Sequence, residues 1–118
     1  MAMWGVGSFR DLAAYRRASA FADALHSVVW RWSSFDRWTV GVQLVRAADS
    51  VGANIAEAEG RATAADERRF LIVARSSALE VQHWLDRAEA RGLPLPPRAM
   101  HEAGELGRML NGLIKVRT

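Results

Sequence analysis

The sequence contains no cysteine, and its 118 residues include three prolines and one tyrosine. Without thiols, a disulfide framework, a thiolate zinc site and a cysteine nucleophile are all excluded. No apolar run approaches the roughly 18 residues that a membrane-spanning helix needs. Residues 1–7 lack the basic and the long apolar regions of a signal peptide. We therefore expect a cytoplasmic protein that does not associate with membranes.

Lysine is also scarce, because Lys115 is the only one and every other basic residue is arginine. The formal net charge is +3. Arginine suits two-point contacts with phosphates and carboxylates. A general preference for arginine codons explains the same bias, so the composition leaves nucleic-acid binding open.

Half of the residues are hydrophobic and a quarter are charged, which is typical of a globular protein. Apolar residues recur at three- and four-residue steps in four segments, and no segment alternates like a strand. We predict helices over about residues 8–32, 37–59, 63–91 and 98–116, within one domain of residues 1–118. Short connections favour an all-α, antiparallel, up-down-up-down four-helix bundle.

Several helix ends carry sequence signals. Capping residues are expected at Ser8 with Asp11, at Ser34 or Asp36, and at Thr63 with Asp66. Glycines that end helices are expected at Gly60 and Gly92, and Pro97 fits the first turn of the last helix.

Each segment has an apolar stripe that we expect to form the core. The stripe of the first segment is Leu12, Tyr15, Ser19, Ala22, Leu25, Val29 and Trp32. That of the second is Val42, Val45, Ala48, Gly52 and Ile55, and Glu59 falls in line with it. The fourth has Met100, Ala103, Leu106, Leu110, Leu113 and Ile114. The third has two adjacent stripes, namely Phe70, Ala74, Ser77, Val81, Trp84 and Ala88, and Leu71, Ala78 and Leu85. This doubled stripe indicates contact with a second subunit as well as with the bundle.

The second and third segments also carry a recognisable signature. Residues 43–57 read Gln-Leu-Val-Arg-Ala-Ala-Asp-Ser-Val-Gly-Ala-Asn-Ile-Ala-Glu, and residues 69–77 read Arg-Phe-Leu-Ile-Val-Ala-Arg-Ser-Ser. With the opening Phe-Arg-Asp-Leu of residues 9–12, this resembles the bacterial four-helix-bundle proteins. They are also called 23S ribosomal RNA intervening-sequence proteins, because some are encoded within insertions in large-subunit ribosomal RNA genes. The chain departs from the family pattern at Gly52, where proline is frequent, and at Ser76, where glycine is usual.

The resemblance implies a homopentamer in which five bundles form a barrel around a central channel. It also implies kinship with the accessory variability proteins of diversity-generating retroelements, which bind nucleic acid and a reverse transcriptase through a basic surface. The family name describes a gene location and gives no activity.

Basic side chains are the candidates for contact with RNA or DNA. The candidate nucleic-acid-binding residues are Arg16, Arg17, Arg46, Arg61, Arg68, Arg69 and Arg75. Any such binding would tolerate many sequences, since no helix is typical of base recognition. The alternative is a solvated face, because Asp66, Glu67, Glu80 and Asp86 are interspersed on the same helix.

Asn54 and Glu57 form a second candidate group, with Arg61 one turn later. We expect a structural polar cluster in which a buried carboxylate pairs with an arginine such as Arg46, Arg69 or Arg75. A ligand-binding cluster is the alternative.

A cluster of aromatic residues falls between the first two helices, at Trp30, Trp32, Phe35 and Trp38. It favours a sealed bundle end or a subunit interface, with stacking on unpaired bases as the alternative.

No catalytic arrangement is recognisable. Glu80 and His83 have the spacing of half a di-iron site, but the second pair is missing. We expect no enzymatic activity, metal or cofactor. The sequence thus predicts a homo-oligomeric bundle that binds nucleic acid, or alternatively a scaffold for another protein.

Overall fold

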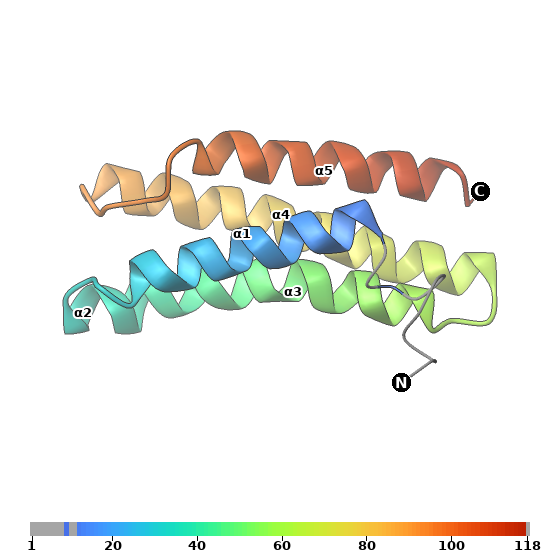
Figure 1. Cartoon of the computed structure of the whole chain (residues 1–118), viewed down its shortest axis with the longest axis horizontal. Coiled ribbons are helices and arrows are strands. Elements are labelled where there is room, and N and C mark those ends of the chain that lie inside the picture. The colour runs from blue at the N-terminus through green and yellow to red at the C-terminus, as the bar shows by residue number, and fades with distance from the viewer. Residues whose placement is uncertain (1–8, 10–11, 118) are drawn as a thin grey trace.

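A computed structural model describes Phe9 and residues 12–117 of the chain. This part is helical and contains no strand, and its elements are α1 (Ala13–Val29), α2 (Ser34–Asp36), the π-helical turn η3 (Arg37–Gly41), α3 (Val42–Glu59), α4 (Ala64–Ala90) and α5 (Ala99–Lys115). Consecutive long helices run antiparallel (Figure 1). α1 and α4 each pack against both α3 and α5, so they lie diagonally across the bundle. The predicted all-α four-helix bundle is confirmed. No helix in the described part is both long and apolar enough to span a membrane.

Two predicted helix ends are confirmed. The hydroxyl of Thr63 accepts a hydrogen bond from the backbone N–H of Asp66 at 3.1 Å and caps α4. Gly92 follows α4 with a φ of +70°, the left-handed conformation that favours glycine. Gly60, in contrast, keeps a right-handed φ of −86°, so α3 ends without a left-handed residue. The capping box expected at residues 8 and 11 lies outside the described residues.

Two other helix starts differ from the prediction. Ser33, rather than Ser34 or Asp36, caps the second helical segment, because its hydroxyl accepts from the backbone N–H of Asp36 at 3.4 Å. α5 begins at Ala99, beyond the expected first-turn position of Pro97. Its N-cap, Arg98, has a φ of +58° and no side-chain cap. The turn after the prolines therefore places an L-residue in the left-handed region, which costs free energy.

The core is one cluster of buried side chains drawn from all four long helices. The predicted stripe of α3 is only partly right, because Val42 and Val45 are half-buried while Leu44 and Val51 are almost fully buried. α3 packs against both α1 and α4, so its buried face is broader than one stripe. Met100 was expected in the core, but its side chain is 41% exposed.

The doubled stripe of α4 is covered within the chain. Residues of both stripes are buried, namely Leu71, Ala74, Ser77, Ala78, Val81, Leu85 and Ala88. Two neighbouring helices, α3 and α5, provide this cover. The bundle itself therefore accounts for the burial of these residues, and contact with a second subunit stays a prediction. The large apolar side chains of α4 that are exposed are Val73 and Leu79, while Phe70 and Trp84 are half-buried.

Candidate interaction site

The candidate arginines lie on several faces of the bundle, and most contact a partner within the chain. Arg17 on α1 makes a two-point ion pair with Glu102 on α5, with Nη2–Oε1 2.6 Å and Nε–Oε2 3.0 Å. The hydrogen bonds and charge of Glu102 raise the pKa of Arg17 above its usual value. Arg75 on α4 donates to Oδ1 of Asn111 on α5 at 2.7 Å. These two arginines tie α5 to its neighbours.

Two more candidates lie beside the loop between α3 and α4. Arg61 pairs with Glu57 at 2.9 Å, and Arg69 approaches Asp66 at 3.4 Å. Both guanidinium groups also lie over the ring of Phe70, at 4.9 and 4.6 Å from its centroid. The ring thus holds two cationic groups close together at one end of the bundle.

The other three candidates are Arg16, Arg46 and Arg68. Arg16 and Arg46 are exposed on α1 and α3. Arg68 is half-buried, and its buried Nε makes no hydrogen bond within the described residues. The seven arginines therefore do not converge on one surface of a single chain.

Asn54 and Glu57 do not form one cluster. The amide of Asn54 donates to the carbonyl oxygen of Ser50 at 2.9 Å and to its hydroxyl at 3.1 Å. The hydroxyls of Ser50 and Ser77 are 2.8 Å apart, which links α3 to α4. Glu57 is exposed and paired with Arg61, so the expected buried carboxylate is absent from this position.

The four aromatic residues between α1 and α3 divide into two groups. Trp32 is 5% exposed, and its indole N–H donates to the carbonyl oxygen of Pro94 at 2.9 Å. It closes the end of the bundle against the α4–α5 connection. Trp30, Phe35 and Trp38 are 66%, 77% and 71% exposed. Three large apolar side chains are thus left in solvent at one end of the chain.

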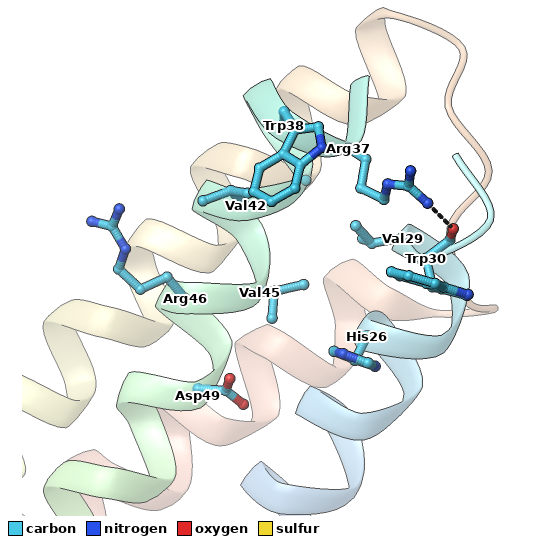
Figure 2. A pocket seen from close by; sticks show the side chains of 10 residues that line it. His26, Val29, Trp30, Arg37, Trp38, Val42, Val45, Arg46 and Asp49 are labelled. Atoms are coloured by element: carbon cyan, nitrogen blue, oxygen red, sulfur yellow. Dashed lines mark hydrogen bonds between the residues drawn. The ribbon is translucent and has the colours of Figure 1, made fainter. Parts of the chain in front are cut away.

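Two of these side chains border a groove between α1 and the η3–α3 segment (Figure 2). The groove has a volume of about 480 Å³ and is lined by His26, Val29, Trp30, Arg37, Trp38, Gly41, Val42, Val45, Arg46 and Asp49. Valines from both helices line it, and Arg46 and Asp49 lie on its α3 wall. An apolar concave surface with a few charged groups at its edge is typical of a binding site.

The π-helical turn shapes this groove. Arg37, Trp38 and Gly41 belong to η3 and line the groove together. A Cβ at Gly41 would lie 2.7 Å from Cγ1 of Val29 and 3.2 Å from the carbonyl oxygen of Asp36. The absence of a side chain there lets the two helices approach closely. Such turns are frequent at functional sites.

Arg37 fixes one wall of the groove. Its Nη1 donates to the carbonyl oxygen of Trp30 at 2.9 Å, as the dashed line in Figure 2 shows. Its guanidinium lies 4.7 Å from the centroid of the Trp30 ring. The two contacts restrain the exposed indole on this wall of the groove.

The sequence indicated the aromatic residues but not the groove. The glycine at position 41, near the start of a long helical segment, was a signal that could have pointed to a close approach. The π turn itself has no comparable signal, because it depends on how α1 and α3 meet.

Glu80 and His83, the half-site considered for a metal, are both exposed. A carboxylate oxygen of Glu80 accepts from the indole N–H of Trp84 at 3.2 Å, and the His83 ring lies edge-on to the same indole. Within the described residues, no group of three or more histidine or carboxylate side chains is arranged to hold a metal ion.

Comparison with known families agrees with the signature of the second and third segments. The sequence model of the family described as 23S rRNA-intervening sequence protein matches residues 10–112. The chain belongs to this family. No curated protein matches the chain.

Proposed function

We propose that the protein is a non-enzymatic, cytoplasmic, homo-oligomeric bundle that uses the aromatic groove to bind another copy of itself. The family resemblance makes a pentamer the expected assembly. One observation carries the proposal: Trp30 and Trp38 are exposed at the edge of an apolar groove in a single chain. Exposed apolar patches of this kind are typical of sites that become buried in a complex.

The surroundings of the groove support the same proposal. The groove combines apolar lining residues with His26, Arg37, Arg46 and Asp49, which gives an apolar centre with polar groups around it. Aromatic and arginine side chains contribute most of the binding free energy in many protein interfaces. A different protein bound in the same groove is the alternative partner.

Light scattering tests the assembly. We expect a mass several times that of one chain, and a lower mass for Trp38→Ala at the same concentration. Val116→Ala is the matched control, because Val116 is 76% exposed and follows α5, outside the groove. A single-chain mass for the unaltered protein would overturn the proposal.

Nucleic-acid binding is a second candidate, favoured by the two guanidinium groups that lie against Phe70. In an oligomer, this end of each chain would add further cationic groups to a shared surface. We expect single-stranded RNA to bind in low salt, and Arg69→Gln to weaken binding and reduce its salt dependence. Arg108→Gln is the control, since Arg108 is exposed on α5 and pairs with Glu105. No gel shift at low salt would remove this candidate.

A further inference from the structure

A hollow between α4 and α5 is lined by several hydrogen-bond donors. It has a volume of about 440 Å³, and its polar lining residues are Arg75 and Gln82 on α4 and Arg108 and Asn111 on α5. All four side chains carry N–H donors, and no carboxylate is among the described residues that line the hollow. Arg75 donates through Nη1 to Oδ1 of Asn111 at 2.7 Å, which uses one of its five N–H groups. The hollow shares no lining residue with the aromatic groove.

Two of these donors converge over Gly104. A Cβ at Gly104 would lie 3.6 Å from Nε2 of Gln82 and 3.9 Å from Nη1 of Arg108, so the amide from α4 and the guanidinium from α5 approach the same point. Glu105 accepts from Nε and Nη2 of this guanidinium, at 3.2 and 2.6 Å. That ion pair does not involve the N–H groups of Nη1. Arg108 therefore offers donors to the hollow while it is paired with Glu105.

Two glycines of α5 also line the hollow. Gly104 and Gly107 lie in the interior of the helix, where glycine lowers helix stability relative to alanine. Packing within the described chain does not require them, because a Cβ at Gly104 would make ordinary contacts and a Cβ at Gly107 would meet no atom within 4 Å. A side chain at either position would narrow the hollow. The two glycines therefore keep open a space that the bundle itself does not fill.

We propose that this hollow binds an organic phosphate monoester, whose phosphate contacts Arg75 and Arg108 and whose apolar part covers Leu79. Near neutral pH a monoester carries a charge of about −2 and has three terminal oxygens, which match two guanidinium groups and an amide. A carboxylate or a backbone phosphodiester carries a single charge on two terminal oxygens, so each satisfies fewer of these donors. Leu79 is 61% exposed and lines the same hollow, so a ligand with an apolar group gains free energy by covering it.

Isothermal titration calorimetry with phenyl phosphate tests the choice of ligand. We expect saturable binding of phenyl phosphate, and binding weaker by about tenfold for benzoate and for the diester phenyl methyl phosphate, because each loses a charge-assisted contact. Inorganic phosphate should also bind more weakly, since it has no apolar group to cover Leu79. No saturable binding of phenyl phosphate, or equal affinity for any of the other three ligands, would overturn the inference.

Substitutions of charged residues test the location of the site. Arg75→Gln and Arg108→Gln should each weaken phenyl phosphate binding by about tenfold. Arg91→Gln is the matched control, because Arg91 is exposed after the end of α4 and does not line the hollow. Glu105→Gln should strengthen binding, since Glu105 competes with the phosphate for Arg108. An equal loss for Arg91→Gln would mean that net charge alone attracts the ligand, and the assignment to the hollow would be wrong.

Gly107→Leu tests the hollow without removing a charge. Its side chain would enter open space, so we expect phenyl phosphate binding to be lost while circular dichroism melts show no loss of thermal stability. Gly112→Leu is the matched control, since a Cβ there also meets no atom within 4 Å and Gly112 lies outside this hollow. Unchanged binding by folded Gly107→Leu would contradict the site. The inference is independent of the proposed function, because none of these variants alters the aromatic groove, and light scattering should give them the mass of the unaltered protein.

Discussion

The guanidinium of Arg17 and the carboxylate of Glu102 join α1 to α5 through two parallel hydrogen bonds of 2.6 and 3.0 Å. α1 packs more extensively against α3 than against α5, so this ion pair bridges the weaker contact. An arginine that the sequence suggested for phosphate binding therefore contributes to holding the bundle together.

Replacing Arg17 tests that role. We expect Arg17→Gln to lower the thermal unfolding temperature slightly, and by less in high salt, because the pair is partly exposed and screened. Circular dichroism melts in low and high salt measure this. Arg108→Gln is the matched control, since its partner Glu105 is on the same helix. A larger loss for the control would contradict a bridging role for Arg17.

Glu105 gives a prediction about pH. Its hydrogen bond and ion pair with Arg108 hold the pKa of this carboxyl below its usual value. A depressed folded-state pKa stabilises the fold above the unfolded-state pKa of about 4.3, and this contribution is lost as the pH falls through the folded-state pKa. We expect Glu105→Gln to be less stable than the unaltered protein at neutral pH. On acidification, the variant should lose less stability than the unaltered protein does. Denaturant melts at several pH values measure this, with Glu89→Gln, an exposed position on α4, as control.

Two glycines in the second helical segment should respond oppositely to alanine. Gly41→Ala places a Cβ 2.7 Å from the stiff, buried side chain of Val29, so we expect a loss of about 1–3 kcal/mol in the free energy of unfolding. At Gly52 the nearest atom, in the ring of Tyr15, would be 3.6 Å away, which is an ordinary contact. Gly52→Ala should therefore raise the free energy of unfolding by up to about 1 kcal/mol, because alanine has the higher helix propensity. Urea unfolding measures both, and equal effects would contradict the close approach at Gly41.

Substitution of Trp32 should affect the stability of the fold, whereas substitution of Trp38 should affect assembly. Trp32 is buried and hydrogen-bonded, so we expect Trp32→Ala to lower the free energy of unfolding by about 3–5 kcal/mol. Trp38 is 71% exposed, so Trp38→Ala should change the stability of the single chain by less than about 0.5 kcal/mol. Unfolding is measured at a concentration where both variants have a single-chain mass, because assembly adds stability. A comparable loss for Trp38→Ala would mean that this indole supports the fold.

Local patterns predicted the regular parts of the fold well. Thr63 with Asp66 and Gly92 set the ends of α4, because capping depends on residues within a few positions of each other. Leu106 and Leu110 are buried as their spacing predicts. The start of α5 was misplaced, since the left-handed Arg98 depends on how the proline segment crosses the bundle end.

The candidate site was less predictable. Arg17 and Arg75 were expected on a phosphate-binding surface, but Glu102 and Asn111, their partners, lie 85 and 36 residues further along the chain. Contacts at such separation follow from helix packing, which one-dimensional periodicity does not describe. The two stripes of α4 show the same limit, because periodicity gives the width of an apolar face and not which neighbour covers it.

By itself, the sequence determined the helical class, the four long helices and the family, since these depend on residue spacing and local capping. The tertiary structure alone decided which arginines have partners, which tryptophan closes the bundle and where the groove opens. Those features arise where α1 meets the π-helical turn and α5 meets α1 and α4, and the relative rotation of packed helices sets them.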